Sequence, residues 1–150
     1  MPYHKYFVAH DLLCRFFASF DKRDWIGMRS VLAPEIFVDY SSSGRETARK
    51  IAAEEFVNAR ANAKDGLTKQ HNFSNLSVVE STAEKLVVSC HYLILRFDLL
   101  STDQQINFYH SCGEYVFELV PFERQYRIAS IKQAMLQSWG NASLHGAIKK

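Results

Sequence analysis

The 150 residues are enough for one ordinary domain with a buried core, and the composition, 47% hydrophobic and 23% charged, excludes a disordered chain. The formal net charge is only +2, and the charges of both signs are well mixed, which argues against nucleic acid or an anionic membrane as a partner. We therefore expect a single soluble domain over residues 1–150.

The first half of the chain predicts mainly helices. Apolar residues recur at helical spacing before Asp21, and the first helix has a strongly aromatic face. Asp24 is a suitable N-cap for a short second helix, which the Ala33-Pro34 pair ends. The expected elements are helices over about 4–20, 24–32 and 47–63, with a strand over 35–40 before the third helix.

The second half of the chain predicts only strands, over about 68–80, 85–97, 106–120 and 125–138. They are long and consecutive, and short turns join them, which favours an antiparallel meander. Helices followed by a run of strands are typical of an α+β fold with the helices on one face of the sheet. A strongly twisted and curved sheet would wrap the helices as a cone, and a pocket inside it is a natural small-molecule site.

Strand phase brings several polar side chains to the expected inner face. His71 is in phase with Asn75, His110 is in phase with apolar neighbours, and Tyr40 lies on the buried side of its strand. Asp21 ends the aromatic helix, where that helix would close over the sheet. Structural alternatives stay open, because each histidine could be a hydrogen-bonded core residue and Asp21 could cap the next helix. Two histidines, a carboxylate and a phenol in inward phase nevertheless favour a functional site.

The remaining features suggest an intracellular, cytoplasmic protein. The N-terminus lacks the apolar core of a secretory signal, and no apolar run has the length of a membrane span. Three scattered cysteines are too few for a disulfide framework, and none forms a C-x-x-C pair that would suggest zinc.

Seven segments together suggest a known family, and they are 17–25, 32–34, 38–40, 53–57, 69–71, 109–110 and 126–129. In this order they resemble scytalone dehydratase and related SnoaL-like proteins of the nuclear transport factor 2-like (NTF2-like) superfamily, whose fold is also called cystatin-like. The resemblance extends from about residue 12 to about residue 139. It is fairly specific in the first half of the chain and looser in the second.

The resemblance implies a cone-shaped, curved antiparallel sheet around N-terminal helices, with an internal pocket and often a homo-oligomer. By position, Asp21 matches the carboxylate of an Asp–His pair, His71 its partner, Tyr40 one tyrosine and His110 a second histidine. Bile acid dehydratase-like proteins are similar at the Asp and His positions. Such a group could remove a proton beside a carbonyl and expel hydroxide without a metal or organic cofactor.

Phe20 departs from the family pattern, because scytalone dehydratase has a tyrosine before the aspartate. One phenol of the family's pair is thus missing, while the Asp–His pair remains. From this pair we expect a dehydratase-like lyase or isomerase that acts on a small, mostly apolar carbonyl compound. The expected partners are this small molecule and further copies of the chain in a homodimer or homotrimer. A non-catalytic binding or assembly module of the same fold is the alternative. The residues expected to line the pocket are Phe16, Phe20, Trp25, Phe73 and Met135.

Overall fold

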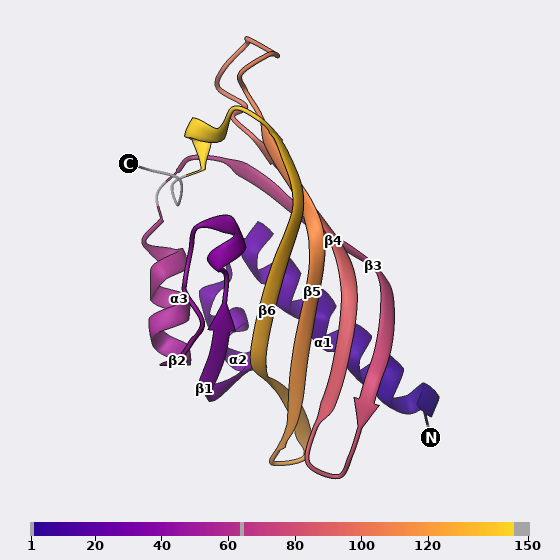
Figure 1. Cartoon of the computed structure of the whole chain (residues 1–150). Helices are drawn as coiled ribbons and strands as arrows, with labels where there is room; N and C mark the ends of the chain where they lie inside the picture. Colours follow the sequence, from indigo (N-terminus) through magenta and orange to yellow (C-terminus); the bar gives the residue numbers. More distant parts are fainter. Residues whose placement is uncertain (1, 64, 146–150) are drawn as a thin grey trace.

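The computed structural model describes residues 2–63 and 65–145, which place helices on one face of a six-stranded sheet (Figure 1). Within this part of the chain, no helix is long and apolar enough to cross a bilayer. The helices are α1 (Pro2–Asp21), α2 (Trp25–Val31), α3 (Ala53–Ala61) and the 3-10 turns η1 (Ser41–Ser43) and η2 (Ala142–Leu144). The strands are β1 (Leu32–Asp39), β2 (Arg49–Ala52), β3 (Thr68–Ser81), β4 (Leu86–Phe97), β5 (Tyr109–Phe122) and β6 (Gln125–Gly140).

The strands lie in the order β2-β1-β6-β5-β4-β3. Strands β3 to β6 form the predicted antiparallel meander, and β1 pairs antiparallel with β2. β1 and β6, however, are parallel, with Val38 opposite Ile131, so the expectation of a wholly antiparallel sheet is wrong at this pair. The reason is local: Leu32 both caps α2 and opens β1, so the helical layer and not a hairpin sets the direction of β1. The α+β class itself is confirmed.

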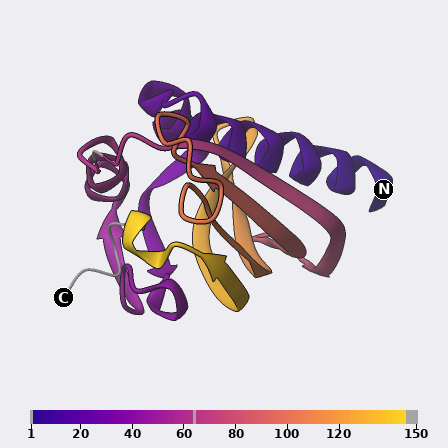
Figure 2. The ribbon, with the colours of Figure 1, turned by 90° about the horizontal axis from the view of Figure 1, so that it is seen from above.

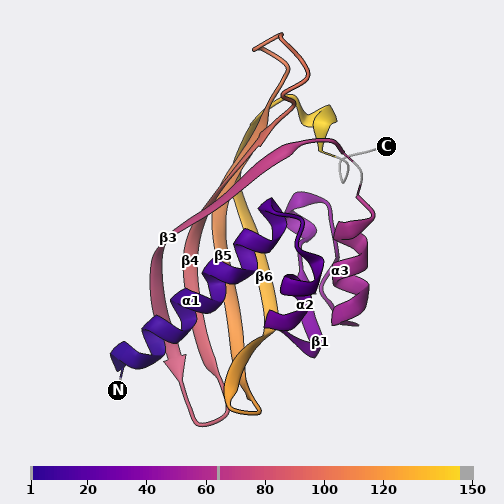
Figure 3. The ribbon, with the colours of Figure 1, turned by 180° about the vertical axis from the view of Figure 1, so that it is seen from behind.

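Helix α1 crosses the face of the sheet that carries the helices, which we call the inner face (Figure 3). It runs from the β3 edge toward α2 and α3, and Figure 2 shows α3 at the other end of the sheet, beside β1 and β2. The aromatic stripe of α1 explains this position. Phe16 packs edge-on against Phe117 at 5.7 Å between ring centroids, and Phe17 lies 5.4 Å from Tyr115. These rings are almost fully buried and form the centre of the core.

The end of α1 is fixed by a change of backbone direction at Arg23, whose φ of 52° lies in the left-handed region. The Asp24 N–H donates to the Ser19 carbonyl at 2.9 Å, which satisfies one of the last carbonyls of the helix. The Asp24 side chain then accepts from the Gly27 N–H at 2.9 Å and caps α2, as predicted. Asp21 is thereby held in the last turn of α1, next to β3.

The third helix is shorter than predicted. Residues 49–52 form β2, and α3 begins only at Ala53 and ends at Ala61. Ile51 is buried beside Ile36 of β1, so pairing at the sheet edge overrides the helical spacing of these residues.

A bulge at Asn75 changes the face that β3 presents. Asn75 has a φ of 57°, and the pairing with β4 shifts between Ser74 and Ser77. Before the bulge His71 and Phe73 point inward, but after it Leu76 packs against the core and Asn75 is exposed. The expectation that Asn75 shares the face of His71 is therefore wrong, because simple alternation does not continue through a bulge.

Candidate active site

A cavity of about 70 Å³ lies between the end of α1, helix α3, the turns η1 and η2, and the inner face of the sheet. Only five of its 17 lining residues are apolar, so it is far more polar than the pocket expected from the sequence. The lining residues are Phe20, Asp21, Arg23, Trp25, Tyr40, Ser43, Arg45, Arg60, Ala63, Leu67, Lys69, His71, Ile94, Arg96, Tyr115, Gln133 and His145.

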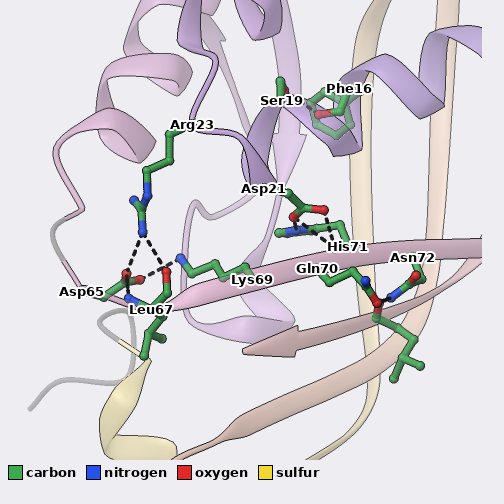
Figure 4. Close-up of polar contacts among 11 residues, drawn as sticks. Phe16, Ser19, Asp21, Arg23, Asp65, Leu67, Lys69, Gln70, His71 and Asn72 are labelled. Carbon is green, nitrogen blue, oxygen red and sulfur yellow. Dashed lines mark hydrogen bonds and ion pairs between the residues drawn. The ribbon is translucent and has the colours of Figure 1, made fainter. Parts of the chain in front are cut away.

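Asp21 and His71 are in direct contact at one side of this cavity (Figure 4). The Asp21 Oδ1 lies 2.7 Å from the His71 Nδ1. The backbone N–H of His71 also donates to both carboxylate oxygens of Asp21, at 3.1 and 3.0 Å. These three contacts fix the position of the carboxylate. They also place the ring proton of the neutral His71 on Nδ1, which donates it in a hydrogen bond to Asp21. The Nε2 atom of His71 is therefore the ring nitrogen that can take a proton from a ligand.

Aromatic rings enclose the imidazole of His71. Phe20 stacks on it at 4.6 Å between centroids with an interplanar angle of 24°, and Phe17 lies beyond at 6.1 Å. Burial is the main cause that lowers the pKa of His71 below its ordinary value of 6.5, and Asp21 acts in the opposite direction. The resting imidazole is therefore neutral at pH 7, as a general base has to be.

Two phenols lie on another side of the cavity. Tyr40 follows β1 and is only 3% exposed, and burial raises its pKa to about 12, against the opposing effect of Arg60. Burial also raises the pKa of Tyr115 well above 10, and the Tyr115 oxygen accepts from Gln133 Nε2 at 2.9 Å. Both phenols keep their protons at neutral pH, so each can donate a hydrogen bond to an oxygen of a ligand.

Five of the lining residues are lysine or arginine, and three of these five have a carboxylate partner. Arg60 makes a bidentate ion pair with Glu46, in which Arg60 Nη2 and Glu46 Oε1 are 3.0 Å apart. Asp65 is shared by Lys69 at 2.7 Å and Arg23 at 3.6 Å (Figure 4). No such partner is found for Arg45 or Arg96 in the described part of the chain. The lining is thus positively charged in excess.

The structure brings some of the predicted site residues together and leaves others outside. Asp21, His71 and Tyr40 line the cavity, and so do Phe20 and Trp25. The other predicted residues, Phe16, Phe73, His110 and Met135, do not line it.

Each of these exceptions has a packing reason. Phe16 lies fully buried in the core behind the cavity, and Phe73 packs against His10 and Phe17 under α1. Met135 lies at a separate depression beside Leu136.

His110 is the main correction to the expected site. Its Nδ1 accepts the backbone N–H of Arg96 at 3.1 Å, and its ring packs against Phe97, Phe108 and Trp139. On β5 the alternate residues, among them Tyr115, face inward instead. The apolar neighbours of His110 in the sequence therefore indicated a small cluster on the outer face and not the cavity. The histidine that does line the cavity together with His71 is His145.

Several lining residues were not found from the sequence. Arg96 is in phase with Tyr92 and Ile94, and Lys69 is in phase with His71, so period-two alternation contained a signal for both. The structure pairs Lys69 directly with Arg96 across β3 and β4. His145 carries no such signal, because it follows β6 in a turn whose position depends on the whole sheet. In the part of the chain that is described, no three His, Cys, Asp or Glu side chains gather as a metal site.

Comparisons with known proteins agree with this architecture. The sequence model of the scytalone dehydratase family matches residues 1–134. The fold is similar to that of Kfla4162 from Kribbella flavida, with 16% identity, a TM-score of 0.81, and 91% of this chain and 93% of that chain covered. The sequence has no match among curated protein sequences.

Two further solved structures share the fold at low identity. An NTF2-like family protein from Streptomyces avermitilis is 10% identical, with a TM-score of 0.71 over 91% of this chain and 99% of that chain. A type 2 hexachlorocyclohexane dehydrochlorinase is 14% identical, with a TM-score of 0.73 over 92% of this chain and 89% of that chain. The NTF2-like fold is thereby established.

Proposed function

Because the chain belongs to the scytalone dehydratase family, we propose that it is a dehydratase-like lyase or isomerase that acts on a small carbonyl compound in the cavity. One observation carries the proposal: Asp21 holds Nδ1 of a buried, neutral His71 at 2.7 Å, which leaves Nε2 as a base beside the cavity. The similarity to a dehydrochlorinase fold is compatible with elimination chemistry. The proposed reaction uses side chains of the chain alone.

In the proposed reaction His71 removes a proton from the carbon next to the substrate carbonyl. The electron pair of the broken C–H bond forms an enolate, and Tyr40 donates a hydrogen bond to its oxygen. The enolate then expels a hydroxyl group from the adjacent carbon, and the protonated His71 returns its proton so that water leaves. Asp21 orients the imidazole and balances its transient positive charge. Return of the proton to a different carbon would give isomerisation.

Phe20 removes one phenol from the pattern of the family, but the cavity still contains two. Tyr115 lies 6.0 Å from Tyr40 between ring centroids, and both line the cavity with His71. We propose that Tyr115 supports Tyr40 in binding the carbonyl oxygen. Phe20 itself stacks on His71 and helps to exclude water from the base.

The test uses Asp21→Asn and His71→Gln, with Asp11→Asn as the matched control. Asp11 is an exposed carboxylate that pairs with Arg15 and lies outside the cavity. Incorporation of deuterium from D₂O next to the carbonyl of small hydroxy-carbonyl compounds, followed by proton NMR, reports proton removal directly. We expect both site variants to lose about 10²–10⁴-fold in exchange rate, the usual range for general acid–base catalysis, while the control is unchanged.

Circular dichroism of the variants separates catalysis from stability. Folded Asp21→Asn and His71→Gln proteins that exchange deuterium at the wild-type rate would contradict the proposal. Variants that unfold, while the folded wild-type protein binds carbonyl compounds without any exchange, would instead favour the non-catalytic binding module.

A further inference from the structure

Arg96 is a buried cation whose bonding groups are only partly used. Its side chain is 7% exposed, and it lies on β4 facing the cavity. Nη1 donates to the Tyr109 carbonyl at 3.3 Å and to the Ser111 hydroxyl at 3.2 Å, and both acceptors are neutral. A guanidinium has five N–H donors, so its other nitrogens are available to a ligand. A buried charge without an opposite charge is costly, which makes an unpaired Arg96 unusual.

Arg45 adds a second guanidinium to the same cavity. It follows η1, is half-buried, and has no side-chain hydrogen bond or ion pair among the described residues. Burial and the like charge of Arg60 lower the pKa of Arg45, and the more distant carboxylates of Glu46 and Asp65 offset this only in part. The charge of Arg45 in turn contributes to the lowered pKa of Arg96. By contrast, Arg60 has Glu46. Among the five lysine and arginine side chains that line the cavity, only Arg45 and Arg96 therefore lack a carboxylate partner within the described residues.

Independent of these charges, three buried polar atoms at the cavity lack a hydrogen-bond partner within the described residues. They are Tyr40 Oη, Gln133 Oε1 and His145 Nε2. Buried polar atoms are hydrogen-bonded as a rule, so three exceptions around one cavity indicate that a polar ligand or ordered water supplies the missing contacts.

We propose that the cavity binds a short oxo or hydroxy acid, whose carboxylate contacts Arg96 and Arg45. A guanidinium matches a carboxylate with two parallel N–H donors, and Tyr40 and His145 can complete the hydrogen bonds. The volume of about 70 Å³ favours a compound of few heavy atoms over a polycyclic one. Placement of the reacting carbon at His71 rests on the proposed function, whereas binding of the carboxylate does not.

Isothermal titration calorimetry with pyruvate and with pyruvamide, its neutral counterpart of nearly the same shape, tests the proposal. We expect pyruvate to bind and pyruvamide to bind at least ten-fold more weakly. Arg96→Gln and Arg45→Gln should each raise the Kd for pyruvate at least ten-fold. Arg49→Gln is the matched control, because it removes the same charge from a surface pair with Glu55 and should leave the Kd unchanged.

Three results would overturn the proposal: equal affinity for pyruvate and pyruvamide, unchanged Kd values in both folded arginine variants, or binding of inorganic phosphate in place of pyruvate. Because Arg96 is buried, its variant is checked by circular dichroism, and the half-exposed Arg45 supplies the second test if Arg96→Gln unfolds. Pyruvate binding and deuterium exchange are measured on the same wild-type protein. Carboxylate binding without any exchange would contradict the proposed function alone, and exchange without pyruvate binding would contradict the carboxylate site alone.

Discussion

The imidazole of His145 is enclosed beside the two unpaired guanidinium groups, and these surroundings set the pH at which it takes up a proton. Burial is the main cause that lowers the pKa of His145 to about 4, and Arg96, Arg45 and Lys69 add to the effect. The ring stacks on Tyr109 at 5.5 Å between centroids, and Nε2 has no partner in the described residues. A positive charge on His145 is therefore unfavourable in the folded protein.

This environment predicts a loss of stability in mild acid. Below pH 6.5 the unfolded chain protonates His145, while the folded protein resists until pH 4 is approached. The free energy of unfolding should fall across this window by about 1.4 kcal/mol per pH unit from this residue. Urea denaturation of the wild type and of His145→Gln at several pH values measures the effect. We expect a shallower slope in the variant; parallel slopes would contradict it.

Part of the site could be predicted from the sequence, namely the residues whose position follows from the pattern of one helix or one strand. Asp21 ends a helix and His71 lies in the first regular part of β3, so motif position and strand phase located both. The unpaired guanidiniums could not be recognised, because pairing depends on which carboxylates the fold brings near. Asp65 reaches Lys69 through a short turn, but Arg96 meets Ser111 only through the β4–β5 pairing. Whether a buried guanidinium has a carboxylate partner is decided only by the tertiary structure.

At the scale of the element, β3 shows how one residue redirects half a strand. Asn75 adopts a left-handed conformation that Asn tolerates and β-branched residues resist. The resulting bulge keeps His71 at the cavity and also turns Leu76 toward the core. The length and order of the four long strands could be read from alternation, but this exchange of faces could not, because a bulge has no fixed sequence signature.

The bulge makes a specific prediction for stability. Asn75→Val should lower the free energy of unfolding by about 1–2 kcal/mol, because the branched side chain is strained at positive φ. Asn75→Gly should be close to neutral or slightly stabilising, since glycine adopts this conformation freely. Ser74→Val, at an exposed extended position of the same strand, is the control and should change stability by less than about 0.5 kcal/mol. Equal effects of valine at both positions in urea denaturation would contradict the strain.

At the scale of the whole molecule, the outer face of the sheet carries exposed apolar side chains on β4 and β6, the two strands that flank β5. Leu93 on β4, with Leu136 and Trp139 on β6, are 38%, 79% and 41% exposed. Leu93 lies opposite Cys112, which in turn lies opposite Gln137, so the strands that carry these side chains are held side by side through β5. We propose that a second copy of the chain covers this face, since contiguous apolar surface on a sheet favours association.

Sedimentation velocity tests the association. The wild type should sediment as a dimer or trimer at micromolar concentration, and Leu136→Lys should shift it toward the monomer. Leu100→Lys is the control, because Leu100 is 93% exposed in the connection between β4 and β5 and lies away from the outer face. A monomeric wild type, or the same shift in both variants, would contradict the proposed interface.

The parallel pair of β1 and β6 also affects when the fold can form. Leu32 lies opposite Ile128 and Val38 opposite Ile131, so one of the first strands to leave the ribosome must wait for the last strand of the chain. Until β6 is synthesised, the apolar side of β1 and the aromatic stripe of α1 have only an incomplete sheet against which to pack. Contacts between such distant segments are formed slowly. During translation, these apolar surfaces are therefore expected to stay incompletely covered for longer than in a purely local hairpin meander.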